Sequence, residues 1–80
     1  MYPEEFKIRI NSIDRVKTLV KIVQEYPEDI DISSGRYVID AKSIMAIFSF
    51  DLTKDLYIRI HTDDLETLKR FNEELDIFKV

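Results

Sequence analysis

Apolar and polar residues alternate along four short stretches of the chain, and a period of two is typical of half-buried β-strands. The predicted strands span residues 5–10, 29–33, 36–41 and 56–61. Ser34 and Gly35 separate the second strand from the third and supply a turn, which predicts a β-hairpin. The apolar positions of these strands are Phe6, Ile8, Ile10, Ile30, Ile32, Tyr37, Ile39, Ala41, Leu56, Ile58 and Ile60.

Two other stretches show the spacing of amphipathic helices, and a short apolar run between them, residues 44–48, could by itself be a strand or a helix. Ser43 as a cap and the Met45-Ala46 pair favour a helix for this run. Residues 12–26 form the first predicted helix, for which Asn11 and Ser12 offer an N-cap and which Pro27 ends. Residues 43–50 form a short second helix with Ser43 as its N-cap, and residues 64–76 form the third. The apolar stripes of the two long helices are Ile13, Val16, Leu19, Val20 and Val23, and Leu65, Leu68, Phe71 and Leu75.

The resulting element order is βαββαβα, and we expect residues 1–80 to form a single domain. A chain of this length buries only about 60–65% of its unfolded surface, so every apolar face has to be used. Strands with one apolar face and helices with one apolar stripe pack as two layers. The sequence therefore predicts an α+β fold, a two-layer open-faced β-sandwich.

Composition narrows the classes of function. Twelve Lys and Arg against sixteen Asp and Glu give a formal charge of -4, which argues against partners that are nucleic acids or anionic membrane surfaces. Gly35 is the only glycine, so phosphate-binding loops that need several glycines are excluded. With no cysteine, no long apolar run and an acidic start, we expect a cytoplasmic protein without a cofactor or metal.

The run Lys42-Ser43-Ile44-Met45 resembles the start of the short second helix in HPr, the histidine-containing phosphocarrier family of the sugar phosphotransferase system. Ser49, Ile58 and Ile60 also fall on matching family positions, and Asp29-Ile30 is similar to the start of the family's second strand. The resemblance implies an antiparallel sheet in the order 1-4-2-3, covered on one face by three helices. It also implies a protein that is not an enzyme.

The stretch Asn11-Ser12-Ile13-Asp14-Arg15 departs from the family, which places its phosphorylated histidine here, followed closely by an arginine and a proline. Ser12 or Ile13 takes the place of the histidine, depending on a shift of one residue. An imidazole is nucleophilic near neutral pH and forms a labile phosphoramidate, whereas a serine would form a phosphoester that is not passed on readily. We therefore expect no competence as a histidine phosphocarrier and no catalytic residue.

Ser43 is the candidate regulatory site. In Gram-positive members of the family the matching serine is phosphorylated, and the related Crh proteins, which lack the histidine, act only through it. The plainer interpretation of Ser43 is a helix N-cap. The resemblance also implies a partner-contact patch at Ile44, Met45 and Phe48, which could serve a homodimer, and anion contacts at Arg15 and Lys42. The implied partners are a serine kinase and a transcriptional or metabolic regulator.

Two other features have plainer interpretations. His61, the only histidine, alternates to the outer face of the fourth strand, and nothing near it has metal-ligand spacing. Charged residues on the outer sheet face predict cross-strand ion pairs in contact with solvent; they are Lys7, Arg9, Asp31, Asp40 and Arg59. An alternative function, a small-ligand sensor, follows from the βαββαβ order of ACT-like and ferredoxin-like domains. That fold has a different sheet order, so the sheet order distinguishes the two alternatives.

Overall fold

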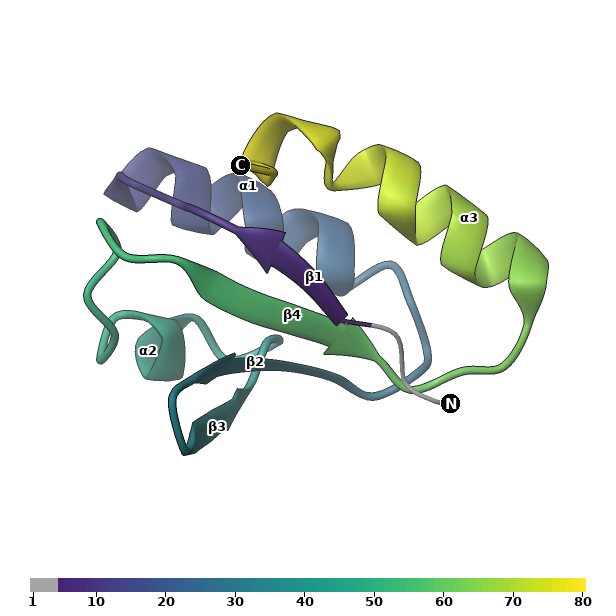
Figure 1. Ribbon diagram of the computed structural model, residues 1–80, viewed down its shortest axis with the longest axis horizontal. Helices are drawn as coiled ribbons and strands as arrows, with labels where there is room; N and C mark the ends of the chain where they lie inside the picture. The colour runs from purple at the N-terminus through teal and green to yellow at the C-terminus, as the bar shows by residue number, and fades with distance from the viewer. Residues whose placement is uncertain (1–4) are drawn as a thin grey trace.

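The computed structural model describes residues 5–80 and confirms the predicted order of elements (Figure 1). The elements are β1 (Glu5–Ile8), α1 (Ile13–Val23), β2 (Ile30–Ser34), β3 (Tyr37–Asp40), α2 (Ile44–Ile47), β4 (Leu56–Ile60), α3 (Leu65–Glu74) and the 3-10 turn η1 (Asp76–Phe78). Residues 1–4, which contributed the acidic start of the sequence, lie outside the described residues.

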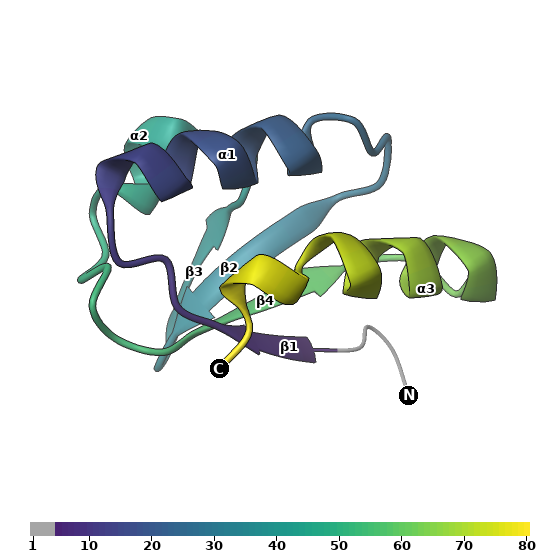
Figure 2. The ribbon, with the colours of Figure 1, turned by 90° about the horizontal axis from the view of Figure 1, so that it is seen from above.

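The strands form one antiparallel sheet in the order β1-β4-β2-β3, as the family resemblance implied. β4 lies between β1 and β2, with Phe6 opposite Ile58 on one side and Ile32 opposite Ile58 on the other. The three helices cover one face of this sheet, as Figures 1 and 2 show together. This strand order differs from that of ferredoxin-like domains, so the ACT-like alternative is wrong.

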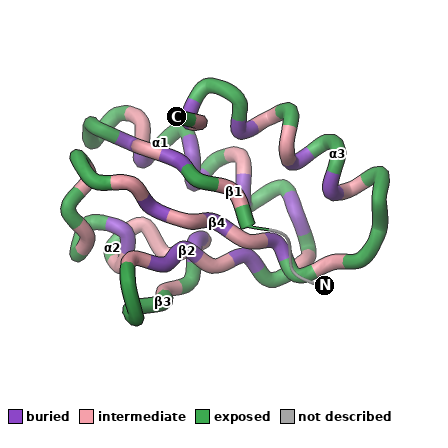
Figure 3. The backbone as a smooth tube through the Cα atoms, viewed as in Figure 1, coloured by how far each residue is buried: buried purple, intermediate pink, exposed green. Residues whose placement is uncertain are grey.

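Buried residues of the sheet and of the helices form one core. Figure 3 marks the buried positions in purple along both layers. Two apolar residues of the predicted helix stripes are not part of this core, because Ile13 is 60% exposed and Leu65 is 73% exposed. Each is the first residue of its helix, where the Cα–Cβ bond tilts toward the helix N-terminus and carries the side chain past the end of the helix. The core begins one turn later, at Val16 and Leu68.

The first helix is shorter than predicted and ends four residues before Pro27. α1 ends at Val23, and the chain then tightens through hydrogen bonds from Glu25 N to Ile22 O and from Tyr26 N to Val23 O, both 3.2 Å long. This turn brings Tyr26 into the core, where it is 2% exposed. Its ring packs edge-on against Phe71 with centroids 5.2 Å apart, which ties the end of α1 to α3.

Several further boundaries differ from the prediction; Ser34, which was expected in the turn, is the last residue of β2, and α3 ends at Glu74 rather than at residue 76. β1 ends at Ile8, although Ile10 is still fully buried, and α2 ends at Ile47 rather than at residue 50. A β-bridge pairs Ile8 with Lys79, so the C-terminal segment lies against the outer strand β1. Figure 2 shows the C-terminus beside this strand.

Candidate functional site

The N-terminus of α1 is built around Ser12, which is the N-cap residue of this helix. Its Oγ accepts a hydrogen bond of 3.2 Å from Arg15 N, as serine does at helix starts. Asn11, just before it, has φ 74°, a left-handed conformation that asparagine tolerates better than most residues. The Asn11 N–H donates to Leu52 O over 2.8 Å, which fixes the entry into the helix. Ser12 rather than a histidine therefore stands at the helix mouth, with exposed Ile13 next to it.

The guanidinium group of Arg15 turns back from α1 toward the carbonyl oxygens of three residues. Nε donates to Ile10 O over 2.6 Å, and Nη2 donates to Arg9 O over 3.2 Å and to Ile77 O over 2.7 Å. The guanidinium carbon also lies 4.7 Å from the ring centroid of Phe78. Arg15 thus links the segment that follows β1 to the C-terminal turn. The anion contact expected of Arg15 stays a prediction. Its Nε and Nη2 already donate hydrogen bonds within the chain.

Ser43 is the N-cap of α2, and its Oγ accepts a hydrogen bond of 3.3 Å from Ala46 N. Within residues 5–80 the hydroxyl donates to no acceptor. Ile47 is fully buried and anchors this short helix to the core, so the residues around it have to face outward. Met45 is 76% exposed and Phe48 40% exposed, while Ile44 is half-buried. α2 therefore presents Ser43 beside an apolar surface, close to the helix α1 (Figure 2).

Lys42, the other expected anion contact, reaches into the structure. Its Nζ donates to Tyr26 O over 2.6 Å and so connects the start of α2 to the end of α1. The Tyr26 hydroxyl in turn donates to Glu74 Oε1 over 2.7 Å and accepts from Arg70 Nε over 3.1 Å. Burial raises the pKa of Tyr26, and Glu74 adds to this shift while Arg70 opposes it. An anion contact of Lys42 also stays a prediction.

The outer sheet face shows only part of the predicted cross-strand ion pairing. Arg59 pairs with Asp31 at 3.2 Å, whereas Arg9 pairs at 2.6 Å with Asp55, which precedes β4, and Asp40 has no ion-pair partner among the described residues. His61 Nε2 lies 2.5 Å from the second oxygen of Asp31. His61 directly follows β4 at the end of the sheet away from the start of α1 (Figure 1). The one histidine of the sequence is therefore held by Asp31 and does not replace the missing imidazole.

Residues 5–80, the part of the chain that the structure describes, contain neither a cluster of metal-ligating side chains nor a helix that could cross a membrane. No cluster of three or more histidine and carboxylate side chains is arranged to hold a metal ion there. None of the helices in this part has both the length and the apolar character to cross a bilayer.

The sheet order, the three helices on one face and the two capped helix starts define an open-faced sandwich of the phosphocarrier type. The family model described as PTS HPr component phosphorylation site matches residues 15–75. The chain therefore belongs to the HPr family, the phosphocarriers of the phosphotransferase system, which are not enzymes.

A solved structure supports the same fold. The crystal structure of HPr-C-His from Thermoanaerobacter tengcongensis is 20% identical in sequence to this chain, with a TM-score of 0.72. The match covers 91% of this chain and 90% of that chain. No curated protein matches the sequence.

The sequence predicted the starts of α1 and α2 correctly, but it did not predict two hydrogen bonds at the start of α1. They run from Asn11 N to Leu52 O and from Arg15 to Ile77 O. The left-handed Asn11 gave a weak signal, since asparagine is enriched in that conformation. The bond from Arg15 to Ile77 spans most of the chain, and no local pattern of residues predicts it.

Proposed function

We propose that this chain is a regulatory protein-interaction module of the phosphotransferase system that does not carry phosphate on histidine and is controlled by phosphorylation of Ser43. One observation carries the proposal. Ser43 caps α2 two positions before exposed Met45, whereas the helix that bears the family's active histidine is capped here by Ser12.

The chemistry of Ser12 argues against phosphate carriage. Helix N-termini attract phosphoryl groups through free N–H groups and the helix dipole, so the start of α1 is electrostatically suitable. A relay also requires a nucleophile whose phosphorylated form transfers the group onward, as an imidazole does. A phosphorylated serine does not pass its phosphoryl group on readily. The single imidazole of the sequence, on His61, is hydrogen-bonded to Asp31.

A phosphoryl group on Ser43 would change the surface of α2 strongly. It adds a charge of about -1.5 to -2 and three acceptor oxygens next to an apolar patch. A partner could then place an arginine on the phosphate and an apolar side chain on the patch formed by Ile44, Met45 and Phe48. The same patch without phosphate offers only apolar contacts, so the modification acts as a switch between partners.

The partners implied are a serine kinase and a transcriptional or metabolic regulator in the cytoplasm. Recognition through a small apolar patch with one charged centre is typical of transient regulatory contacts. The formal charge of -4 keeps nucleic acid and membrane surfaces outside the proposal.

Two parallel phosphorylation reactions test the proposal. In the first, the chain is incubated with enzyme I of the phosphotransferase system and phosphoenolpyruvate; in the second, with a serine kinase of the HPr family and ATP. Intact mass spectrometry should show no added phosphoryl group in the first reaction and one in the second. The Ser43→Ala variant should lose the second signal, and the Ser12→Ala variant should keep it. Transfer from enzyme I would refute the loss of carrier function, and an unmodified second sample would refute control through Ser43.

A pair of surface variants tests the patch in the same kinase reaction. Met45→Glu places a charge on the patch, whereas Leu65→Glu places the same charge on an equally exposed residue of α3, with exposures of 76% and 73% in the native chain. We expect only Met45→Glu to slow the phosphorylation of Ser43. Equal rates for the two variants would show that the patch does not contact the kinase.

A further inference from the structure

β3 forms the outer edge of the sheet opposite to β1, and it leaves backbone groups without partners. The Ala41 N–H donates to Ile30 O over 2.9 Å, which sets the phase of the ladder between β2 and β3. In an antiparallel ladder every second residue exchanges hydrogen bonds with its partner strand, so Ile39 and Tyr37 continue this set. The N–H and C=O of Val38 therefore point away from the sheet, and so does the N–H of Asp40.

The side chains of this edge are unusually apolar for an open strand. Tyr37 is 66% exposed and Val38 54% exposed. Natural proteins protect such edges with charges, prolines or covering segments because unpaired edges bind other strands. Covering of this kind is present at the opposite edge, where Lys79 bridges to Ile8 on β1. Within residues 5–80 no segment covers β3 in the same way.

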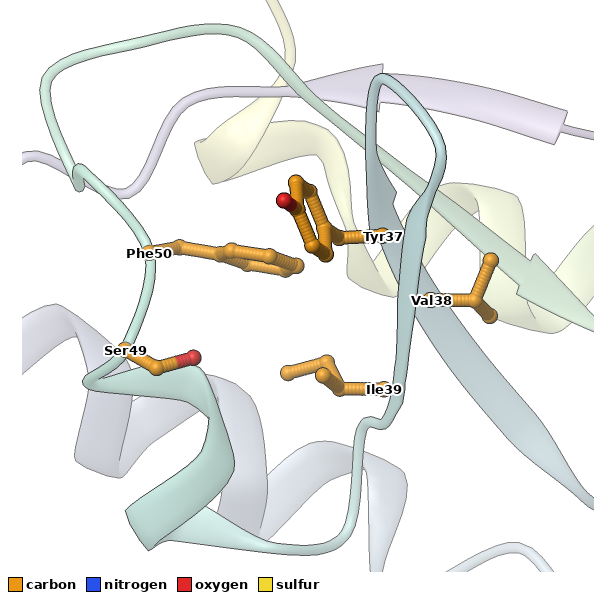
Figure 4. Close-up of a pocket in the computed structure, with 5 residues that line it drawn as sticks. All are labelled: Tyr37, Val38, Ile39, Ser49 and Phe50. Carbon is orange, nitrogen blue, oxygen red and sulfur yellow. The ribbon is translucent and has the colours of Figure 1, made fainter.

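A pocket of about 330 Å³ adjoins this edge on the helix side of the sheet. Tyr37, Ile39 and Phe50 point toward it, and Val38 points to the opposite face (Figure 4). The edge therefore offers backbone groups and an apolar hollow side by side. An added strand would place alternate side chains toward that hollow.

The charges around Val38 identify the occupant. If two copies of β3 pair antiparallel about a two-fold axis at Val38, Arg36 of each copy lies opposite Asp40 of the other. Within the described chain neither Arg36 nor the Asp40 carboxylate has an ion-pair partner. Asp40 also lies opposite Asp31 on β2, and the carboxylate of Asp31 is already paired with Arg59. Like charges opposite each other on neighbouring strands are destabilising. The guanidinium group of Arg36 from the second copy would compensate the charge of Asp40 and so relieve the repulsion between Asp31 and Asp40.

The same register suits the remaining side chains. Val38 lies opposite Val38 of the second copy, and Tyr37 lies opposite Ile39, an aromatic and β-branched pair of the kind that stabilises antiparallel sheets. Tyr37 of the second copy then reaches the mouth of the pocket beside Ile39. One surface thus complements itself in charge, in shape and in hydrogen bonds, as a two-fold interface requires.

We propose that two copies of this chain associate through β3, in antiparallel register about Val38, and join their sheets into one continuous sheet. The contact uses neither Ser43 nor the α2 patch, so it is independent of the proposed regulatory function and leaves that surface free. The interface involves one short strand from each copy, so we expect a weak dimer with a Kd of roughly 10–100 µM.

Charge reversal tests both the interface and its register. Sedimentation equilibrium over a range of concentrations should show the native chain as a dimer in equilibrium with its monomer. Arg36→Asp and Asp40→Arg should each weaken the dimer by roughly tenfold or more, because like charges then meet at both ends of the contact. The double variant Arg36→Asp/Asp40→Arg, and an equimolar mixture of the two single variants, should recover it. Circular dichroism verifies that each variant is folded.

Disulfide trapping in the otherwise native chain gives a second readout that does not depend on the charge variants. The sequence contains no cysteine, so a single Val38→Cys substitution introduces the only thiol. Opposite residues of a hydrogen-bonded antiparallel pair lie about 5.5 Å apart between Cα atoms, within the range of a disulfide. Val38→Cys should cross-link on mild oxidation faster than Met45→Cys on the α2 patch.

Four outcomes would overturn the proposal. They are a native chain that stays monomeric at concentrations on the order of 1 mM, a dimer that withstands Arg36→Asp, a double variant that fails to recover association, and faster cross-linking at residue 45. The last result would place a dimer on the α2 patch instead. Phosphorylation of Ser43 does not enter any of these measurements, so they fail or succeed separately from the proposed function.

Discussion

Replacing Arg15 by methionine should destabilise the domain strongly, although the residue is partly exposed and lies at a helix start. Its guanidinium group donates three hydrogen bonds to the carbonyls of Ile10, Arg9 and Ile77. Methionine keeps much of the length and the apolar stem of the side chain but removes every donor. The variant therefore isolates the polar link between the segment after β1, α1 and the C-terminal turn.

The size of the effect follows from the individual contacts. A hydrogen bond from a charged donor contributes about 1.5–3 kcal/mol when buried, but water can replace the exposed bond to Ile77 O and part of the others. The guanidinium–aromatic contact with Phe78 adds about 0.5–1 kcal/mol. We expect a loss of about 2–4 kcal/mol in the free energy of unfolding, which corresponds to a decrease of roughly 10–25 °C in Tm for a domain of this size.

Urea unfolding followed by circular dichroism measures this loss, and Lys17→Met, on the exposed side of the same helix, serves as the matched control. The control should stay within about 0.5 kcal/mol of the native chain. Amide hydrogen exchange should locate the effect, since the Arg9 N–H, bonded to Phe78 O at 2.8 Å, should exchange faster in Arg15→Met. A loss below about 0.5 kcal/mol for Arg15→Met would refute the assigned role, because it would show that the three carbonyls gain nothing from the guanidinium.

Two further predictions concern other polar contacts. Tyr26→Phe removes the bonds to Glu74 and Arg70 while it keeps the ring, and should cost about 1–2 kcal/mol in urea unfolding at neutral pH. The pKa of Tyr26 is raised in the folded state, so its contribution to the free energy of unfolding is full below the unfolded pKa of about 10 and is lost as pH rises through the folded pKa. The Tyr26→Phe variant should therefore lose stability less steeply in alkali than the native chain. The same loss of stability with pH in both proteins would contradict this. The pKa of Asp64 is lowered by hydrogen bonds from the side chain and backbone of Thr67, so its contribution is present above about pH 4 and is lost as pH falls through the folded value. Asp64→Asn keeps the cap oxygen without the titration and should flatten the acid unfolding curve measured by circular dichroism, whereas an unchanged curve would argue against the assigned cause.

The cap residues are the part of the candidate site that local sequence predicts best. Ser12 and Ser43 were expected as N-caps, and residue 64 as the start of the third helix. Ser12, Ser43 and Asp64 each accept a hydrogen bond from the backbone N–H three residues later. A cap depends on a few neighbouring residues only, so its chemistry is visible in a short stretch of sequence. The role of Ser43 beyond capping, as a phosphorylation site, stays a proposal.

The exposure of the helix ends was harder to predict. Ile13 and Leu65 fit the apolar stripes of α1 and α3, yet both are largely exposed. Periodicity gives the direction of a side chain around a helix but not the point along the axis where the helix passes over the sheet. The same holds for α2, where the structure buries Ile47 completely and leaves Met45 76% exposed.

The sequence by itself determined the order of strands and helices, the capped helix starts and the absence of a histidine before the first helix. These properties depend on residues that are close together along the chain. Only the tertiary structure decided that Arg15 holds Ile77, that Asp31 holds His61 and that β3 is left as an open edge. Such contacts join residues far apart in the sequence, and they form because strand pairing and burial bring distant segments together; no local pattern encodes them.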